Sequence, residues 1–284
     1  MNQSARPRAA VVGSMNSDLV VRCLQLPRPG ETVVGDDVVR LPGGKGGNQA
    51  AALARLGVAT SIVACLGRDD LGERLLDSLA AHGADTLMIQ RSDRATGTAF
   101  ITIDAVGENQ IVVAPGANAE LTLADVDFDP FDVVLAQMEV APEIIDELAR
   151  RTSSLVLNVA PARAVAPSTL SRCAVVIANE LESRTLELGD LAHCVVTRGR
   201  GGAVHYSFGE VITEVPAPEV DVVDSVGAGD VFCAAYTSRY ALHDDAASAL
   251  RFAVTAGALA TMALGAQGSL PTTQEVLSWL DHAS

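Results

Sequence analysis

The segment from Val222 to Ala235 combines a turn of small residues with one acidic side chain in a spacing that suits phosphate chemistry. A β-branched apolar run ends at Asp224, Gly227 and Gly229 follow, and Asp230 opens an apolar segment of helical character. Glycine lets the backbone turn sharply and lets a ligand approach it closely. The first N–H groups of a helix lack intrahelical partners and lie at the positive end of its dipole, so they can hold a phosphate or a developing oxyanion.

A carboxylate at the rim of such a site can take a proton from a hydroxyl that attacks a phosphoryl group. Asp230 is therefore the candidate general base, and the N–H groups of Gly227, Ala228 and Gly229 are the candidate anion hole. The same residues also have a purely structural interpretation, because an acidic residue in a first helical turn stabilises the helix dipole. For this segment alone the structural interpretation is the stronger one, and the rest of the chain reverses the balance.

The composition is that of a folded, acidic, globular protein. The chain has 284 residues, of which 49% are hydrophobic and 19% charged, with a formal net charge of -15. Such a chain can bury a large core and lies outside the composition of disordered proteins. A surface of this charge repels nucleic-acid phosphates and anionic membranes, so we expect neither as a partner. A bound nucleotide would need local help from helix N-termini and Mg²⁺.

Targeting signals and cysteine usage favour a cytoplasmic protein. Residues 1–8 are polar and contain no apolar core, so we expect no secretion signal there. The longest uncharged stretch, 252–274, contains Pro271 and predicts a buried helix followed by a loop rather than a membrane span. The five cysteines are scattered, without metal-ligand spacing, which predicts free thiols in a reducing compartment. They are Cys23, Cys65, Cys173, Cys194 and Cys233.

Apolar runs that are typical of buried strands alternate with segments of helical periodicity along most of the chain. The predicted strands include 9–12, 61–64, 133–136, 155–157, 175–178 and 194–197. The predicted helices include 50–56, 71–82, 231–242, 246–264 and 273–281. This alternation predicts one α/β domain, residues 1–284, with three α/β/α layers around a mainly parallel central sheet.

Two regions, from about 18–42 and 96–113, interrupt this alternation. Their short apolar pieces are separated by Pro, Gly and Asp, which predicts antiparallel strands. The predicted strands in these regions include 19–21, 32–34, 38–39, 98–103 and 110–113. Antiparallel strands inside an otherwise alternating chain predict a small inserted β-sheet lid, whose free edges need covering.

Polar residues follow several of the predicted parallel strands. Ligands bind at the carboxyl ends of such strands, so several polar end residues in succession predict one cleft, although each alone also fits a turn or a helix start. These residues are Asn16, Asp18, Glu139, Asn158, Asn179, Glu182 and the glycine-rich turn 198–202. A second glycine-rich run, 43–47 around Lys45, predicts close approach of the backbone to a small ligand. It is neither a complete phosphate-binding Walker loop nor a dinucleotide fingerprint.

Together these motifs resemble the ribokinase group of the PfkB-type carbohydrate kinase family, over nearly the whole chain. The resemblance rests on residues 13–18, 29–32, 43–50, 116–118, 138–139, 158–162, 179–182, 196–199 and 224–230. It implies the ribokinase-like fold and the ATP-dependent phosphorylation of D-ribose at its primary (5-) hydroxyl. It also implies a homodimer in which two β lids pair.

The resemblance further implies a role for particular residues. It assigns the sugar to Asn16, Ser17, Asp18, Gly44, Lys45, Gly46, Gly47, Asn48, Glu139 and Asp230. It assigns the nucleotide to Asn179, Thr197, Arg198, Gly199, Arg200, Gly201, Gly202 and Gly229. It assigns Mg²⁺, through water, to Asn179 and Glu182, and K⁺ to Asp224, Val226, Ala260, Ala263, Gly265 and Ser269, several of them through backbone carbonyls.

Two features depart from the family pattern. The chain between Asn179 and Cys194 is shorter than in the family, so we expect a helix there to be missing or reduced to a turn. Val254 stands where many relatives place Asn or His near the adenine, which leaves the nucleotide preference open.

Three alternatives remain open at this stage. The first is a sibling kinase for deoxyribose, fructose or a nucleoside such as adenosine, although no aromatic wall for a base lies in 16–18 or 43–48. The second is a non-catalytic sugar or nucleotide sensor on the same fold, against which the retained Asp230 argues. The weakest is a dinucleotide oxidoreductase, because no complete Gly-x-Gly-x-x-Gly unit follows the first strand.

Overall fold

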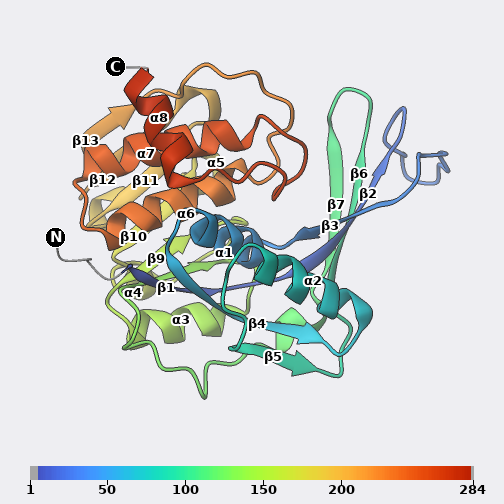
Figure 1. Cartoon of the computed structure of the whole chain (residues 1–284), viewed down its shortest axis with the longest axis horizontal. Coiled ribbons are helices and arrows are strands. Elements are labelled where there is room, and N and C mark those ends of the chain that lie inside the picture. Colours follow the sequence, from blue (N-terminus) through green and yellow to red (C-terminus); the bar gives the residue numbers. More distant parts are fainter. Residues whose placement is uncertain (1–5, 283–284) are drawn as a thin grey trace.

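The computed structural model describes residues 6–282. Residues 1–5, which carry most of the segment predicted to lack a secretion signal, and residues 283–284 lie outside the described residues. A large sheet lies between layers of helices, and a smaller sheet projects from one end of this body (Figure 1). The predicted three-layer α/β architecture with an additional small sheet is confirmed.

The larger sheet has the strand order β13-β12-β11-β10-β9-β8-β1-β4-β5 within residues 6–282. All neighbours from β5 to β11 are parallel, and β12 and β13 extend the sheet as an antiparallel hairpin. In register, Val11 of β1 pairs with Ile62 on one side and Leu135 on the other. The bounds are β1 (Arg8–Val12), β4 (Ala59–Gly67), β5 (Ile89–Ser92), β8 (Val133–Gln137), β9 (Leu155–Asn158), β10 (Val175–Asn179), β11 (Cys194–Thr197), β12 (Ala203–Ser207) and β13 (Glu210–Val215).

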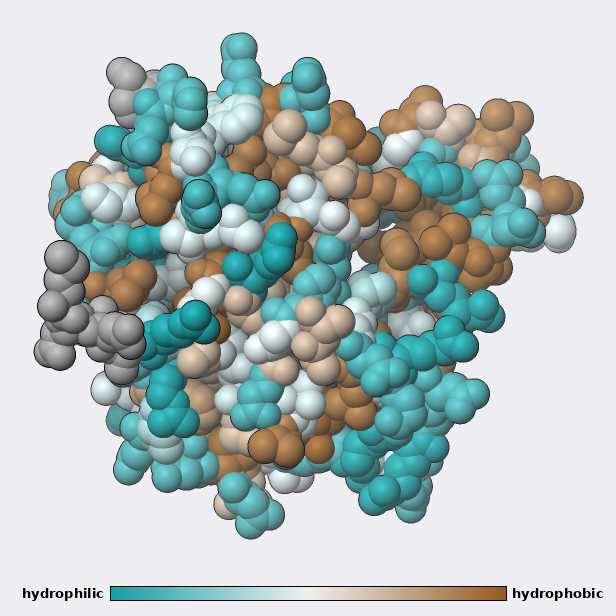
Figure 2. Space-filling view, in the orientation of Figure 1, coloured by the Kyte–Doolittle hydropathy of each residue, from teal (hydrophilic) through white to brown (hydrophobic). Residues whose placement is uncertain are grey.

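The smaller sheet has the order β3-β2-β6-β7. Its strands are β2 (Asn16–Arg22), β3 (Val39–Gly43), β6 (Gly97–Ile103) and β7 (Asn109–Ala114). The pairs β2–β3 and β6–β7 are antiparallel as predicted. The neighbours β2 and β6 are parallel, and the chain between them forms β3, α1, β4, α2 and β5. In the surface view, hydrophobic side chains gather on this projecting sheet among hydrophilic ones (Figure 2).

One predicted strand of this region is wrong. Residues 32–34 form no strand, and only Gly35 makes an isolated bridge, to Cys23. Pro27, Pro29 and Gly30 precede this segment and break regular pairing, and the Val34 side chain is 94% exposed. An apolar piece without a neighbouring strand or a core to cover it has no reason to become extended.

Helices cover both faces of the larger sheet. Their bounds are α1 (Lys45–Arg55), α2 (Asp70–Ala81), α3 (Pro142–Arg151), α4 (Pro167–Leu170), α5 (Glu180–Ser183), α6 (Ala228–Ala241), α7 (Ala246–Ala260) and α8 (Thr273–His282). Short 3-10 turns are η1 (Gly116–Glu120), η2 (Leu188–Asp190) and η3 (Gly199–Gly201). Good N-caps begin several helices; the side chain of Asp69, for example, accepts the Gly72 N–H at 2.8 Å.

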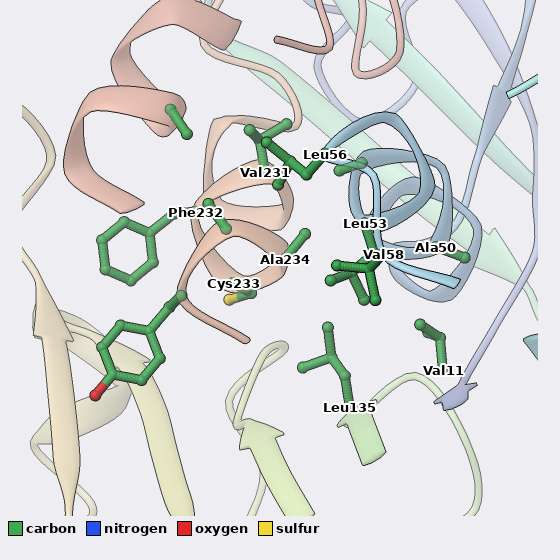
Figure 3. Close-up of a cluster of buried hydrophobic side chains, with 14 of the residues drawn as sticks. Val11, Ala50, Leu53, Leu56, Val58, Leu135, Val231, Phe232, Cys233 and Ala234 are labelled. Atoms are coloured by element: carbon green, nitrogen blue, oxygen red, sulfur yellow. The ribbon is translucent and has the colours of Figure 1, made fainter. Parts of the chain in front are cut away.

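Alternation along the strands divides the interior into two cores. Val11 and Leu135 face α1 and α6, where they meet side chains such as Leu53 (Figure 3). Their neighbours Val12 and Val134 face the other side of the sheet, which α3, α4 and η1 cover. Burying one such side chain stabilises the fold by about 1.5–3 kcal/mol, so the first core holds α1 and α6 firmly against the sheet.

Two helix boundaries differ from the prediction. The helix predicted over 50–56 is α1 and begins already at Lys45, because Gly46 packs directly on the backbone of Gly13 and Ser14. A Cβ atom on Gly46 would lie only 2.6 Å from the carbonyl carbon of Gly13. The helix predicted over 246–264 ends at Ala260, and 261–269 form irregular turns. Both differences place backbone near the carboxyl ends of the strands.

The segment between Asn179 and Cys194 contains only the single turn of α5 and the turn η2. The expected reduction of a helix to a turn is therefore confirmed. Each of the five cysteines is a free thiol. None of the helices within residues 6–282 has the length and apolar character needed to cross a membrane.

Candidate active site

Asp230 lies in the first turn of α6 with only 6% of its surface exposed. Gly227 caps this helix in the left-handed conformation, with φ +80°. Two side-chain amides from α1 hold the carboxylate: Asn48 Nδ2 donates to Oδ2 at 3.0 Å and Gln49 Nε2 donates to Oδ1 at 3.1 Å. The candidate base is therefore fixed at both oxygens.

Lys45 supplies the positive charge beside this carboxylate. Its Nζ atom lies 4.0 Å from Asp230 Oδ1. Burial raises the pKa of Asp230, and the charge of Lys45 and the amides of Asn48 and Gln49 offset part of that increase. The neighbouring carboxylate in turn raises the pKa of Lys45, so the lysine is charged at neutral pH. A base with a raised pKa accepts a hydroxyl proton more readily.

Asp18 and Glu139 complete a polar cluster with these groups. The Oδ1 atom of Asp18 is buried and has no hydrogen-bond partner within residues 6–282. Burial, followed by the charges of Glu139 and Asp230, raises the pKa of Asp18 to about 7. Glu139 Oε2 accepts the hydroxyl of Ser14 at 2.5 Å and the backbone N–H of Lys45 at 3.0 Å. A polyhydroxyl ligand can satisfy such acceptors.

Glycines leave room for the side chains of this cluster, because a Cβ atom at their positions would clash with them or with the backbone that carries them. A Cβ atom on Gly43 would lie 2.1 Å from Asp18 Oδ2, and one on Gly44 would lie 2.7 Å from the backbone nitrogen of Asn16. Gly44 also has φ +82°, a conformation that other residues adopt at a cost. Asn16 is held by Asn118, whose Nδ2 atom donates to its Oδ1 at 2.8 Å. The two segments assigned to the sugar, 16–18 and 43–48, are thus in direct contact.

The predicted anion hole lies next to Asp230. The Ala228 N–H donates to the Ser225 carbonyl at 3.3 Å. The N–H groups of Gly229 and Asp230 have no partner among the described residues, as expected in the first turn of a helix. No side chain of this part of the protein therefore blocks the amides that would meet a phosphate.

A cavity of about 1100 Å³ opens on the other side of these amides. The end of β11, the turn η3, the segment 217–222, the first turn of α6 and α7 surround it. Of the residues assigned to the nucleotide, it is lined by Thr197, Gly199, Arg200, Gly202 and Gly229. Val254, which stands where many relatives place Asn or His, also lines it. Residues such as Phe232, Gly257 and Trp279 were not predicted, because their sequence context is that of ordinary helical core.

Three assigned nucleotide residues do not line this cavity. The guanidinium of Arg198 donates to Glu214 at 2.8 Å and to the hydroxyl of Tyr206 at 3.2 Å. Gly201 lies in the turn η3, where a Cβ atom added to it would lie 3.2 Å from the Cβ atom of Arg198. Asn179 caps α5, where its Oδ1 atom accepts the N–H groups of the first turn.

The two residues assigned to Mg²⁺ form a capping box. Glu182 Oε2 accepts the backbone N–H of Asn179 at 2.8 Å, and Asn179 Oδ1 accepts that of Glu182 at 2.8 Å. Glu182 is 7% exposed, and its charge is close enough to Lys45 to contribute to the raised pKa of that lysine. The remaining carboxylate oxygen is the kind of ligand that a water molecule on Mg²⁺ can contact.

The residues assigned to K⁺ lie on two loops that Asp224 joins. Its Oδ1 atom accepts the Val226 N–H at 3.0 Å and its Oδ2 atom accepts the Gly265 N–H at 2.9 Å. Ala260 is the last residue of α7, and Ala263 and Ser269 lie in the irregular segment 261–269 that follows it. The described residues contain no group of three His, Cys, Asp or Glu side chains that suits a metal. An ion here would take backbone carbonyls and a carboxylate, an oxygen set that fits a hard cation.

Several side-chain amides near the site were not assigned a particular role from the sequence. They are Gln49, Asn118, Gln137, Asn158 and Gln267. Gln49 lies inside a motif that the sequence singled out, and Asn158 at a strand end was noted only as one of several polar end residues. Gln267 had no signal, because only the folded chain brings its Nε2 atom within 3.0 Å of Asn48 Oδ1.

Comparison with known proteins places this geometry in a family. Residues 6–273 match the family model described as pfkB family carbohydrate kinase. The ribokinase of Bacillus subtilis (strain 168) is 38% identical over 286 residues, which cover 94% of this chain and 97% of that protein. Among solved structures, ribokinase from Thermotoga maritima has a TM-score of 0.89 and 30% identity, covering 97% of this chain and 99% of that chain. Arabidopsis thaliana ribokinase complexed with ribose and ATP has a TM-score of 0.88 and 27% identity, with the same coverage.

The chain therefore belongs to the pfkB family of carbohydrate kinases. Within that family it is similar to ribokinases over nearly its full length and nearly theirs. The predicted family resemblance and the predicted kinase class are confirmed, and the oxidoreductase alternative is excluded.

Proposed function

We propose that this protein catalyses the ATP-dependent phosphorylation of D-ribose at its 5-hydroxyl, giving ribose 5-phosphate and ADP. The observation that carries the proposal is the position of Asp230. Its carboxylate is buried in the cluster of Asp18, Lys45 and Glu139, while Gly229, its neighbour in the helix, lines the large cavity. A sugar hydroxyl in the cluster and a terminal phosphate at the helix N-terminus would meet at this residue.

The reaction then follows from the geometry. Asp230 accepts the proton of the sugar hydroxyl while the hydroxyl oxygen forms a bond to the γ-phosphorus of ATP. The bond between the γ-phosphorus and the oxygen that stays with ADP breaks. The N–H groups of Gly229 and Asp230 stabilise negative charge on the transferred phosphoryl group. The charged Lys45 lies beside the reacting atoms and stabilises the same charge. The fixed amides of Asn48 and Gln49 keep the base in line with the hydroxyl.

The ions are part of the proposal. We assign Mg²⁺, which neutralises nucleotide phosphate charge when bound, to the neighbourhood of Glu182 and Asn179. Glu182 Oε2 accepts a backbone N–H, so its other oxygen would be the one to contact a water molecule bound to the ion. We assign K⁺ to the Asp224 and Gly265 loops, whose hydrogen bond ties the ion site to the turn that precedes the anion hole.

We propose that the smaller sheet is a lid and a dimer interface. Its strand β2 begins at Asn16, which pairs with Gly43 at the end of β3 beside the sugar cluster, so movement of this sheet would cover the sugar and exclude water. Its exposed apolar side chains, seen in Figure 2, need a partner surface. They include Val39, Phe100, Ile111, Val112 and Val113. A second lid packed on one face would cover those side chains that point to that face, and sedimentation of the purified protein as a monomer at micromolar concentration would contradict this.

The five free thiols agree with a cytoplasmic location, which we also propose.

A substrate panel tests the function. Purified protein is incubated with ATP, Mg²⁺ and K⁺ and one of D-ribose, deoxyribose, fructose or adenosine, and the products are identified by ³¹P NMR. We expect the highest kcat/KM for ribose, with phosphate on its primary hydroxyl. A higher kcat/KM for another acceptor would identify a sibling kinase. Transfer to none of them, with binding of ribose or ATP retained in calorimetry, would identify a sensor.

A further inference from the structure

Gln49 is a fully buried side chain directly behind the candidate base. It lies in the first turns of α1, with 0% of its surface exposed. Its Nε2 atom donates to Asp230 Oδ1 at 3.1 Å and to Asn158 Oδ1 at 3.3 Å. Both protons of its amide are therefore directed to oxygens. Burial of so polar a group without a functional partner would destabilise the fold, so its partners must account for its presence.

A second buried amide determines which way Gln49 is oriented. Gln137, at the end of β8, donates from Nε2 to Gln49 Oε1 at 2.7 Å. An amide has one acceptor oxygen and one donor nitrogen, so this contact turns the NH₂ group of Gln49 towards Asp230. Gly13 makes room for the arrangement, because a Cβ atom there would lie 2.0 Å from Gln137 Oε1. The hydrogen bonds therefore run in one direction: Gln137 donates to Gln49, and Gln49 donates to Asp230.

A parallel chain of amides holds the other oxygen of the base. Gln267 Nε2 donates to Asn48 Oδ1 at 3.0 Å, and Asn48 Nδ2 donates to Asp230 Oδ2 at 3.0 Å. Each carboxylate oxygen therefore accepts one amide proton and keeps a second lone pair for a substrate hydroxyl. The two sets of hydrogen-bonded amides differ in whether a ligand can reach them. Asn48 belongs to the group assigned to the sugar, whereas Gln49 is sealed between α1, β8 and β9.

We propose that Gln49 is a positioning residue for the phosphoryl-transfer reaction: it fixes the orientation and ionisation of the Asp230 carboxylate, and Gln137 sets the direction of its amide. The inference rests on the proposed function, because it assumes that Asp230 is the base. Gln49 acts through Asp230 and does not touch the sugar.

The electrostatic consequence has a definite sign. A hydrogen bond donated to a carboxylate stabilises its charged form and lowers its pKa. The other titratable groups that face Asp230 are Lys45 on α1, Glu139 after β8, Asp18 on β2 and Cys233 on α6. Burial raises the pKa of Asp230, and of these four groups only Lys45 lowers it. Loss of the Gln49 amide would therefore leave the base protonated up to a higher pH.

The test compares Gln49→Met, Gln137→Met and Gln90→Met. Methionine keeps the length of glutamine and removes its amide. Gln90 is the matched control, because its amide also bridges two groups, the N–H and C=O of Thr122, but far from the site. We expect Gln49→Met to lower kcat by about 10- to 100-fold, which is the effect of losing one hydrogen bond to a charged group. The KM for ribose should change by less than about threefold. The acid limb of the pH profile should move up by about one pH unit.

Gln137→Met should show a smaller change in the same direction, since it leaves the Gln49 amide present but free to turn. Gln90→Met should keep the wild-type kcat and acid limb. An unchanged kcat and acid limb in Gln49→Met would overturn the proposal. If that variant does not fold, an acid limb that stays unchanged in a folded Gln137→Met would overturn it as well.

One readout separates this inference from the proposed function. The ¹³C signal of the Asp230 carboxyl, assigned by its loss in Asp230→Asn, reports the pKa of that group without any substrate. We expect the midpoint of this signal to rise in Gln49→Met and to stay at the wild-type value in Gln90→Met. An unmoved midpoint would refute the role of Gln49, whatever the substrate panel shows. A raised midpoint in a protein that phosphorylates no sugar would refute only the proposed function.

Discussion

Asn48 and Asp230 are separated by 182 residues in the chain, and Asn48 Nδ2 donates to Asp230 Oδ2 across 3.0 Å. This contact joins the first turn of α1 to the first turn of α6. It therefore brings the glycine-rich motif around Lys45 and the anion-hole motif into one site.

Asp230→Asn should lower kcat by roughly 10²–10⁴-fold, the usual effect of a lost general base. An amide oxygen can still accept from one neighbour, but the new NH₂ group faces an existing donor, Asn48 or Gln49, so a small loss of thermal stability is expected too. Ribose binding, measured by calorimetry, should persist. A kcat close to that of the wild type would remove Asp230 from the role of base.

The stability of the ligand-free protein should depend on the ionisation of Asp18. Its pKa is about 7 in the folded protein and near 3.8 in the unfolded chain, so folding favours the protonated form. The contribution of Asp18 is therefore fully present below pH 4 and is lost as pH rises from about 4 to about 7. Asp18→Asn should raise Tm at pH 8 by about 2 °C or more, and by less at pH 5.

The exposed Asp77 on α2 provides the control for this measurement. Asp77→Asn should change Tm little, and by the same amount at both pH values. Equal Tm differences at pH 5 and pH 8 for Asp18→Asn would show that burial does not perturb Asp18. Loss of ribose binding in the same variant would agree with its proposed contact to the sugar.

Gly227→Ala should damage both folding and catalysis. The residue has φ +80°, and a Cβ atom would lie 2.6 Å from Ala266 Cα and 2.7 Å from Ala266 Cβ. The backbone conformation alone costs about 1–2 kcal/mol for a non-glycine residue, and the clash adds to it by moving the 261–269 loop. Gly83→Ala is the matched control, because Gly83 has φ +86° with nothing within 4 Å of its Cβ position.

Both variants should lose stability in urea unfolding, Gly227→Ala by more than Gly83→Ala. Only Gly227→Ala should lose kcat, because only that residue begins the helix whose N–H groups are the proposed anion hole. Equal effects of the two substitutions on stability, with kcat unchanged in both, would argue against a functional role for this turn.

Potassium should activate the enzyme over sodium at equal ionic strength. Asp224 joins the two loops to which K⁺ is assigned, so Asp224→Ala should abolish the difference between KCl and NaCl. Asp37→Asn, in the exposed loop after β2, should leave the difference unchanged. Initial rates in the two salts measure the effect, and identical rates for the wild type would count against the ion assignment.

Local patterns were enough to predict the fold class and the motifs of the site. Alternating apolar runs and helical segments predicted the parallel sheet, because buried strands and amphipathic helices have different periods. Proline and glycine marked the region of the smaller sheet, although they also made 32–34 a loop where a strand was predicted. Gly-x-Gly-Asp before a helix predicted an anion site with a base only together with the other motifs of the chain, because a first helical turn with an acidic residue also has a purely structural use.

Only the tertiary structure decided how these local pieces meet. Parallel strands place their carboxyl ends at one edge, so the segments that follow β1 and β8, together with α1 and α6, bring Asp18, Lys45, Glu139 and Asp230 to one point from distant parts of the chain. Burial there raises the pKa of both aspartates, a property that depends on the surroundings and not on residue type. The amides of Gln49, Gln137 and Gln267 gain their role in the same way, because a hydrogen bond between residues far apart in sequence exists only once the chain has folded.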